Sequence, residues 1–310
     1  MGDTNSQTPE QQRQRRKRIN RIKNGIIITI SSWMLASFIA IIVLIVWLVN
    51  LNHKVDQNGT VAVNSTDTEE EETGSTARID YDQIVTGIDT DDNMAVEGDT
   101  HYVYLTFDGG PSSNTEAILD ALAAYNIKAT FFVIGDESEE AAAIYQRIVN
   151  EGHTLGMHSY SNQYSQIYAS TDAFYNDLYL LSDYLYEVTG VRSTYYRFPG
   201  GSSNEISNLN MADFVNVLNK EGIVYYDWNV SAGDASSSYT VDDVISHVTT
   251  GVSKYKTSVV LLHDADNKST TVEAIGPLIE SLQSMGAVIL PIDEDTSVIQ
   301  YIKADSVVEY

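Results

Sequence analysis

The chain has 310 residues, of which 43% are hydrophobic, and it contains no cysteine. This length allows one large α/β domain with appendages, and the missing cysteines exclude a disulfide framework, a thiolate metal site and a cysteine nucleophile. The formal net charge is −25. Residues 1–55 are basic and residues 56–310 are strongly acidic, which excludes nucleic-acid binding by the body because phosphate contacts need lysine and arginine.

The N-terminal head is a basic segment followed by an uncharged one. Arginine and lysine crowd residues 1–25, and residues 26–51 contain no charged side chain. A helix over that run would be about 39 Å long, enough to cross a hydrocarbon core of about 30 Å. We therefore predict a cytoplasmic tail, a transmembrane anchor and an extracellular body at the cell membrane. A cleaved signal peptide is the alternative, although its apolar region would be shorter.

Residues 52–98 are rich in serine, threonine and glycine and include the acidic run 69–72. They lack apolar periodicity, which predicts a flexible acidic linker. The linker would extend the reach of the body or serve as a solubilising stalk, and the sequence favours neither role.

From residue 99 to 310, strand-like and helix-like patterns alternate. Strands are predicted, in chain order, at 102–107, 128–134, 154–158, 195–198, 223–228, 259–263 and 287–291. Helices are predicted between them at 115–126, 139–151, 172–188, 211–220, 241–255 and 271–285. Strands that alternate with helices pair in parallel through right-handed crossovers. The pattern predicts an α/β fold, a reduced β/α barrel of about seven parallel strands, with a doubly wound open sheet as the alternative.

Polar residues follow the predicted strands where a barrel would place its chemistry. Asp108, His158, Arg197, Asp227 and His263 each come at the carboxyl end of a strand. Each residue alone is a weak signal, because an aspartate at a strand end is commonly a turn or capping residue. Their order and identity together are more specific.

These strand ends carry five short motifs in a fixed order. They are TFDGGP at 106–111, HSYSN at 158–162, RFPGG at 197–201, DW at 227–228 and LLHD at 261–264. In this order they resemble the motifs of the polysaccharide deacetylase (NodB-homology) family, of the membrane-anchored peptidoglycan or chitooligosaccharide deacetylase type. The resemblance runs from about residue 102 to 291. It implies a distorted β/α barrel that removes acetyl groups from N-acetylated sugars.

The resemblance also implies roles for individual residues. Asp108 corresponds to the general base, and Arg197 to the arginine that orients it. His263 corresponds to the general acid, and Asp227 to the carboxylate that tunes this histidine. Such a division of proton transfer suits amide hydrolysis, which needs an activated water and a protonated leaving amine. We therefore expect Asp227 to lie within hydrogen-bonding reach of His263.

The family's metal site is where this chain departs from the pattern. A divalent ion of the zinc or cobalt type is implied, held by a second aspartate and two histidines. The second aspartate is replaced by Gly109 and the second histidine by Asn162, so that only His158 of the implied ligands remains. An amide oxygen is a poor, neutral donor for zinc. We expect metal binding, if retained, to be weak.

Other residues are expected to shape the pocket that receives the sugar. Trp228 and Leu261 match positions that line the acetyl pocket in the family, and Pro199 and Tyr160 are assigned to the same pocket. Tyrosines are abundant around the motifs and suit stacking on sugars, although buried tyrosine rings also pack helices on a barrel.

Three functions remain open from the sequence. The first is a working deacetylase with a weak metal site, and the second is a catalytically silent relative that binds cell-wall glycans containing N-acetylated sugars. The third is a tethered interaction domain without a sugar site.

Overall fold

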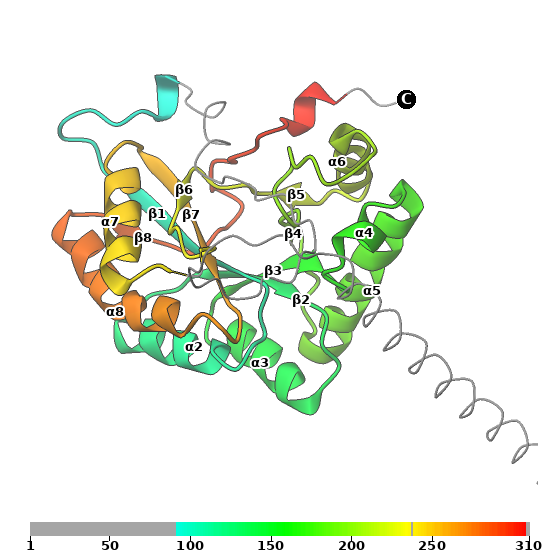
Figure 1. The fold of residues 1–310 in the computed structure, drawn as a ribbon, viewed down its shortest axis with the longest axis horizontal. Coiled ribbons are helices and arrows are strands. Elements are labelled where there is room, and N and C mark those ends of the chain that lie inside the picture. Colours follow the sequence, from blue (N-terminus) through cyan, green and yellow to red (C-terminus); the bar gives the residue numbers. More distant parts are fainter. Residues whose placement is uncertain (1–90, 237, 308–310) are drawn as a thin grey trace, which may run out of the picture. The chain divides into compact units, whose positions relative to one another are not determined.

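The computed structural model describes residues 91–236 and 238–307 (Figure 1). The predicted cytoplasmic tail, the anchor at 26–51 and residues 52–90 of the predicted linker lie outside the described residues and stay predictions. Among the residues that the structure describes, no helix is both long and apolar enough to cross a membrane.

A parallel sheet forms the centre of the described domain. Its strands are β1 Tyr102–Asp108, β2 Thr130–Ile134, β3 Thr154–Ser159, β4 Tyr195–Tyr196, β5 Val224–Tyr225, β6 Val230–Ser231, β7 Thr257–His263 and β8 Val288–Ile289. Seven of the described strands follow the order β5-β4-β3-β2-β1-β7-β6, and β8 pairs with the beginning of β1. All these pairings are parallel, which agrees with the predicted α/β barrel-like fold.

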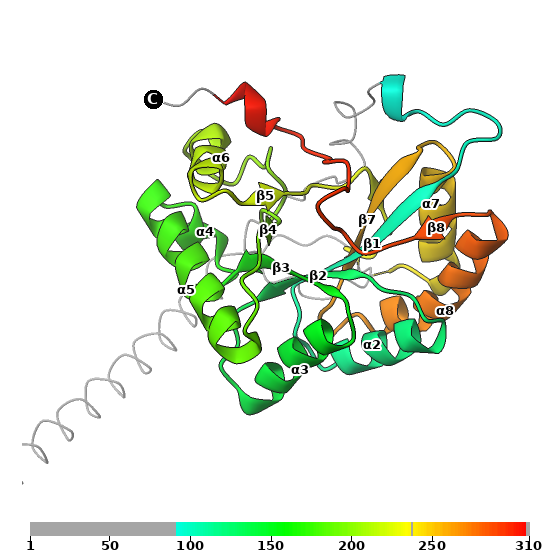
Figure 2. The ribbon, with the colours of Figure 1, turned by 180° about the vertical axis from the view of Figure 1, so that it is seen from behind.

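Helices surround the strands on the outside (Figures 1 and 2). They are α2 Thr115–Ala124, α3 Glu139–Asn150, α4 Tyr164–Ile167, α5 Thr171–Thr189, α6 Met211–Lys220, α7 Val241–Val252 and α8 Ser269–Ser284, with short 3₁₀ turns η2 Asp91–Asn93 and η3 Ala304–Ser306. The longest of these, α5, begins at Ser170, whose side chain accepts a hydrogen bond from the Ala173 amide, and ends at Gly190 in the left-handed conformation. Both ends therefore follow from local sequence.

The alternation of side chains along β1 and β7 separates two apolar clusters. Val103, Leu105 and Phe107 belong to the large cluster under the helices. Tyr104 belongs to a smaller cluster with Val259 and other residues that face the barrel interior. Because successive side chains of a strand point to opposite faces, Asp108 points to the same side as Tyr104.

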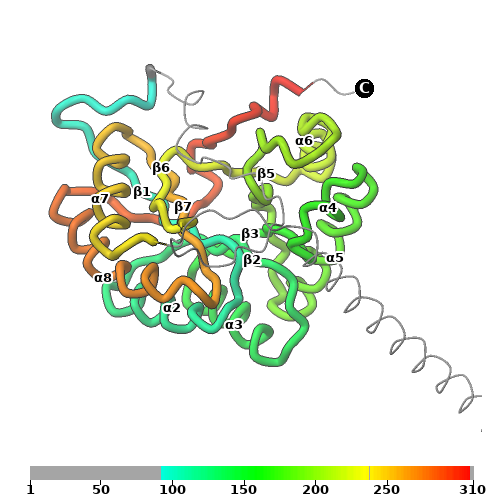
Figure 3. The backbone as a smooth tube through the Cα atoms, in the orientation of Figure 1, coloured from blue at the N-terminus to red at the C-terminus, as the bar shows by residue number. Residues whose placement is uncertain are grey.

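The C-terminal segment pairs with the chain at the end of β5 and just after it. Figure 3 shows this red segment running past β5 and β6. The Asp227 amide donates to the carbonyl of Ile299 at 2.8 Å, and the Gln300 side-chain amide donates to the carbonyl of Tyr225 at 3.0 Å. The predicted strand at 223–228 is therefore observed only as Val224–Tyr225: the Tyr226 amide still donates to Tyr196 of β4, and the chain turns to the C-terminal segment at Asp227.

Three further details differ from the sequence prediction. Strand β6 and the one-turn helix α4 were not predicted, because two and four residues are too short for a periodic signal. Residues 93–96, placed in the linker by sequence, contact the domain: the Asn93 side chain donates to the Thr257 carbonyl at 3.0 Å, and Met94 forms a bridge with Tyr255.

Candidate active site

The predicted base and acid lie side by side at the ends of two adjacent strands. Asp108 and His263 are the last residues of β1 and β7, and they are partners in the register of the two strands. Both follow interior-facing residues by two positions, so that the pleat directs them to the same side. The predicted position at the carboxyl ends of the strands is therefore the observed one.

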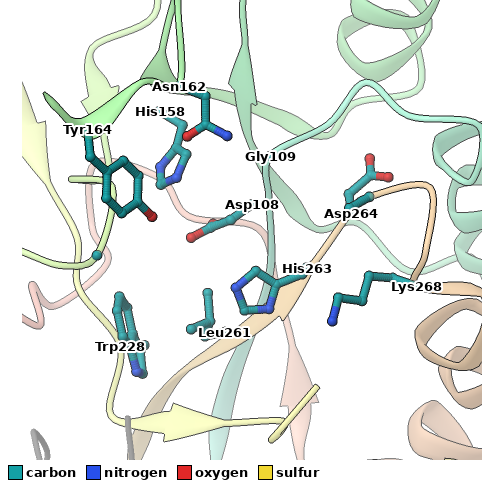
Figure 4. Close-up of a pocket in the computed structure, with 12 residues that line it drawn as sticks. Asp108, Gly109, His158, Asn162, Tyr164, Trp228, Leu261, His263, Asp264 and Lys268 are labelled. Carbon is teal, nitrogen blue, oxygen red and sulfur yellow. The ribbon is translucent and has the colours of Figure 1, made fainter. Parts of the chain in front are cut away.

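Around this pair lies a pocket of about 170 Å³ (Figure 4). It is lined by strand-end and loop residues, namely Asp108, Gly109, His158, Asn162, Tyr164, Gly200, Trp228, Leu261, His263, Asp264, Ala265 and Lys268. Figure 4 shows the Asp108 carboxylate directed into the space between His158 and His263. A group bound there would meet a carboxylate on one side and an imidazole on the other.

Arg197 holds the carboxylate of Asp108 from inside the barrel. Its guanidinium is fully buried and donates to Asp108 Oδ1 at 2.9 Å. Further donation from Nε to the Tyr226 carbonyl at 2.9 Å and from Nη2 to the Asp227 carbonyl at 3.0 Å fixes the guanidinium in one orientation. The arrangement keeps the charge of Asp108 compensated while leaving its other oxygen available.

His263 is paired with Asp234, a residue that the sequence analysis missed. The ring Nδ1 lies 2.8 Å from Asp234 Oδ1, and the His263 amide donates to Asp234 Oδ2 at 2.8 Å. Burial opposes protonation of the ring, but the charge and hydrogen bond of Asp234 outweigh it, so that the pKa of His263 is raised. With Nδ1 turned to Asp234, Nε2 is the nitrogen that can donate a proton in the pocket.

The expected pairing of Asp227 with His263 is wrong. The buried Asp227 carboxylate accepts from the Ser202 amide at 2.7 Å and hydroxyl at 2.6 Å, and from the Tyr301 amide at 2.7 Å. Burial raises the pKa of Asp227 against these hydrogen bonds. The side chain thus joins the loop after β4 to the C-terminal segment, because the chain leaves β5 toward that segment rather than toward β7.

His158 is turned toward the pocket by its own hydrogen bond. Its Nδ1 lies 2.8 Å from the carbonyl of Arg197, which only an N–H can satisfy, so that Nε2 carries the lone pair. The ring is buried, and burial lowers the pKa of His158. A neutral imidazole with a free Nε2 is the form that binds a metal ion.

The remaining residues do not complete a metal site. Gly109 carries no side chain and has φ of +96°, and Asn162 has φ of +50° and offers only a neutral amide. Across the part of the chain that the structure describes, no group of three or more histidine, aspartate or glutamate side chains could hold a metal ion. One imidazole and one amide do not fit the implied divalent ion, because such sites need three protein ligands.

The predicted pocket residues separate into two groups. Trp228 and Leu261 line the pocket. Pro199 and Tyr160 do not: the Pro199 carbonyl accepts from the Tyr168 hydroxyl at 2.8 Å in the core, and the Tyr160 hydroxyl donates to Glu137. Both residues belong to the motifs, but neither is among the residues that line the pocket.

Residues outside the five motifs also line the pocket. Tyr164, two residues after Asn162, directs its ring into the pocket, and Lys268 lies beside His263 (Figure 4). The ammonium of Lys268 donates to the backbone carbonyl of Asp234. Asp234 also follows a strand, which would have marked it as a candidate. That strand, β6, has only two residues and could not be recognised from the sequence.

Comparison with known proteins agrees with this geometry. Residues 95–221 match the polysaccharide deacetylase family model. The Bacillus subtilis protein YheN, which is named as a polysaccharide deacetylase, is 30% identical over 231 residues, covering 73% of this chain and 78% of that protein. The peptidoglycan-N-acetylglucosamine deacetylase PgdA of Listeria monocytogenes is 30% identical over 196 residues, but the match covers only 38% of its length.

A solved structure gives the same result. The catalytic domain of peptidoglycan N-acetylglucosamine deacetylase from Eubacterium rectale has a TM-score of 0.62 and 36% identity, covering 67% of this chain and 95% of that domain. The motifs, the barrel-like fold and these relatives agree with one another. The chain belongs to the polysaccharide deacetylase family.

Proposed function

We propose that this chain is a membrane-anchored, extracellular protein of the N-deacetylase type that binds acetamido sugars of cell-wall glycans and deacetylates them slowly or not at all. The glycan class is taken from the relatives, whose names refer to peptidoglycan N-acetylglucosamine. The anchor and the orientation rest on the basic residues before the uncharged run 26–51.

One observation carries the binding half of the proposal. A base held by Arg197 and an acid held by Asp234 face each other in one pocket, in positions that suit an acetamido group. In hydrolysis, the oxygen of a water would add to the carbonyl carbon while Asp108 takes one of its protons. His263 would give a proton to the nitrogen as the carbon–nitrogen bond breaks, leaving acetate and a free amine.

The same site explains why turnover should be slow. General acid–base catalysis by a carboxylate and an imidazole alone typically contributes about 10²–10⁴-fold. The positions that would hold a family-type metal are occupied by Gly109 and Asn162, so that the activation of water and the stabilisation of the oxyanion lack that contribution. A catalytically silent glycan-binding relative is therefore the second candidate, and Gly109 is the observation that favours it.

The test separates binding from turnover. Full-length protein in detergent is titrated with N-acetylglucosamine oligomers, and amine release is followed with and without added zinc or cobalt. We expect saturable binding and little or no amine release, unchanged by the metals. The variant Asn162→Tyr, which adds a ring at an exposed position of the pocket wall, should weaken binding. Fast metal-dependent turnover by the unmodified chain would contradict the proposal. Equal binding of the oligomers by the unmodified chain and by Asn162→Tyr would show that they do not bind in this pocket.

A further inference from the structure

The outer side of α5 carries an unusual concentration of exposed aromatic rings. Tyr175, Tyr179 and Tyr186 are 39%, 53% and 48% exposed, and Leu180 beside them is 53% exposed. These residues follow the exposed face of one helix that packs on the core through Phe174, Leu178, Leu181 and Leu185. Single exposed apolar side chains are ordinary, but a contiguous group on one face commonly marks an interaction site.

A second cavity lies beside these rings. Its volume is about 200 Å³, comparable to the strand-end pocket. Tyrosine rings, hydroxyls and two charged groups line it, namely Tyr175, Leu178, Tyr179, Ser182, Arg192, Ser193, Thr194, Glu221 and Ile223. Aromatic faces combined with a few polar groups are typical of small-molecule and sugar sites.

Two of the tyrosine rings that line the cavity pack against each other. Tyr175 and Tyr179 are one helical turn apart, with ring centroids 6.2 Å apart and an angle of 19° between their planes. Rings stacked in this way hold each other in a fixed orientation, and together they give the cavity an apolar wall. The C–H face of an uncharged pyranose chair can pack against such a wall while its hydroxyls reach the neighbouring polar groups.

The charges of the cavity favour a neutral ligand over an anion. The Arg192 guanidinium is already paired with Asp183 at 2.9 Å and lies 4.5 Å from the centre of the Tyr186 ring. Glu221 adds a carboxylate to the lining. An anion would need an uncompensated cation, whereas a neutral sugar needs donors and acceptors, which Arg192, Glu221 and the hydroxyls supply.

The cavity is separate from the active site, and the two share no lining residue. Arg192, Ser193 and Thr194 come just before β4, at the opposite end of the strands from Asp108 and His263. Helix α5 begins shortly after Asn162 and Tyr164 of the strand-end pocket and runs to this opposite end (Figure 1). At about 1.5 Å per residue it spans roughly 28 Å, the length of several sugar units.

We propose that the outer face of α5, centred on Tyr175 and Tyr179, is a second binding site for a neutral glycan chain of N-acetylated sugars. The class of sugar rests on the proposed function, whereas the site itself does not use the strand-end pocket. A chain long enough to reach both α5 and that pocket would bind more tightly than a short oligomer, because two contacts on one polymer reinforce each other.

The test uses full-length protein in detergent, N-acetylglucosamine hexamers and insoluble chitin. We expect the double variant Tyr175→Ala/Tyr179→Ala to lose about tenfold or more in affinity for both, the loss of two stacking contacts. The double variant Tyr175→Phe/Tyr179→Phe keeps the rings and should bind like the unmodified chain. Tyr102→Ala, which removes a ring that is 43% exposed on β1, is the matched control and should change nothing.

Each other outcome has a defined meaning. Unchanged affinity of the alanine pair would overturn the inference, and so would an equal loss in Tyr102→Ala, which would indicate nonspecific adhesion. An equal loss in the phenylalanine pair would overturn the stacking argument. If Asn162→Tyr leaves binding intact while the alanine pair abolishes it, the proposed strand-end function fails and the α5 site stands. If the unmodified chain binds neither probe, both fail.

Discussion

Substitutions can restore metal-binding side chains at the two positions that depart from the family pattern, Gly109 and Asn162. We expect Gly109→Asp with Asn162→His to bind zinc more than about 100-fold more tightly than the unmodified chain. The bound is conservative, because changing a group that only supports a ligand already costs about 10–100-fold in affinity. The neutral Nε2 of His158 is available as the third donor.

The structure sets a different folding cost for each substitution. Gly109 has φ of +96°, and a Cβ atom there would meet the Asp264 carbonyl oxygen at 3.4 Å, an ordinary contact. The cost is therefore backbone strain rather than collision, about 1–2 kcal/mol. In a domain of this size that lowers the Tm by roughly 2–8 °C. Asn162 has φ of +50°, a conformation that histidine adopts comparatively readily, so that this change should cost less than about 1 kcal/mol.

The assay is a titration of metal-stripped full-length protein, both single variants and the double variant with zinc and cobalt. Cobalt absorption reports the coordination geometry independently of activity, and thermal unfolding reports the strain. Tight stoichiometric zinc in the unmodified chain would show that other residues complete a site, which refutes the reasoning. A folded double variant that binds no better than either single variant would show that the three positions do not converge.

Four further predictions follow, three from the hydrogen bonds of the site and one from the charge pattern at the N-terminus. Asp234→Asn should lower the pKa of His263 in an NMR titration while Asp227→Asn leaves it unchanged, because Asp234 carries the pairing. The pair raises the folded pKa of His263 and lowers that of Asp234, so its stabilisation is full between about pH 4 and 6.5. Urea unfolding should show the difference between the unmodified chain and Asp234→Asn shrinking as the pH rises through the folded pKa of His263, or falls through that of Asp234. Asp227→Ala should cost about 2–4 kcal/mol in unfolding free energy, because buried donors lose their acceptor. Protease added to intact cells should degrade residues 52–310 and spare an N-terminal tag.

The fold was largely predictable because its long elements carry strong signals. The core strands β1 and β7 are continuous apolar runs, and α5 has an apolar stripe bounded by Ser170 and Gly190. Of the two-residue strands, β4, β5 and β8 lie within predicted strands that are longer than the observed ones, and β6 was not predicted. What they contribute is set by partners distant in sequence, such as the C-terminal segment at Ile299.

The positions of site residues were predictable where a residue ends a long strand. The prediction failed where the chain bends after a short strand. Asp108 and His263 end β1 and β7, and the pleat alone directs them inward. Asp227 and Asp234 both follow short strands, and the sequence gives no sign of which one reaches His263. That choice depends on where the chain turns after β5 and β6, which is decided by Ser202, Tyr301 and the packing of the C-terminal segment.

The retained parts of the motifs also hold the fold together, and this limits what their presence says about catalysis. Arg197 is fully buried and joins Thr106 on β1 to the carbonyls of Tyr226 and Asp227. Removing Asp108 would leave that charge uncompensated in the interior, at a cost of about 3–5 kcal/mol.

Asp234 has a comparable structural role. It accepts hydrogen bonds from the His263 amide and the Thr271 hydroxyl, and so fixes the beginning of α8 to the end of β7. Gly109 and Asn162, by contrast, occupy positions where a metal-binding side chain would project into the pocket, so that replacing such a side chain there costs the fold little. A chain of this family can therefore stop binding metal and still keep its base, its acid and their partners for stability alone. For this reason metal affinity and amine release, rather than the motifs, decide whether the protein is an enzyme.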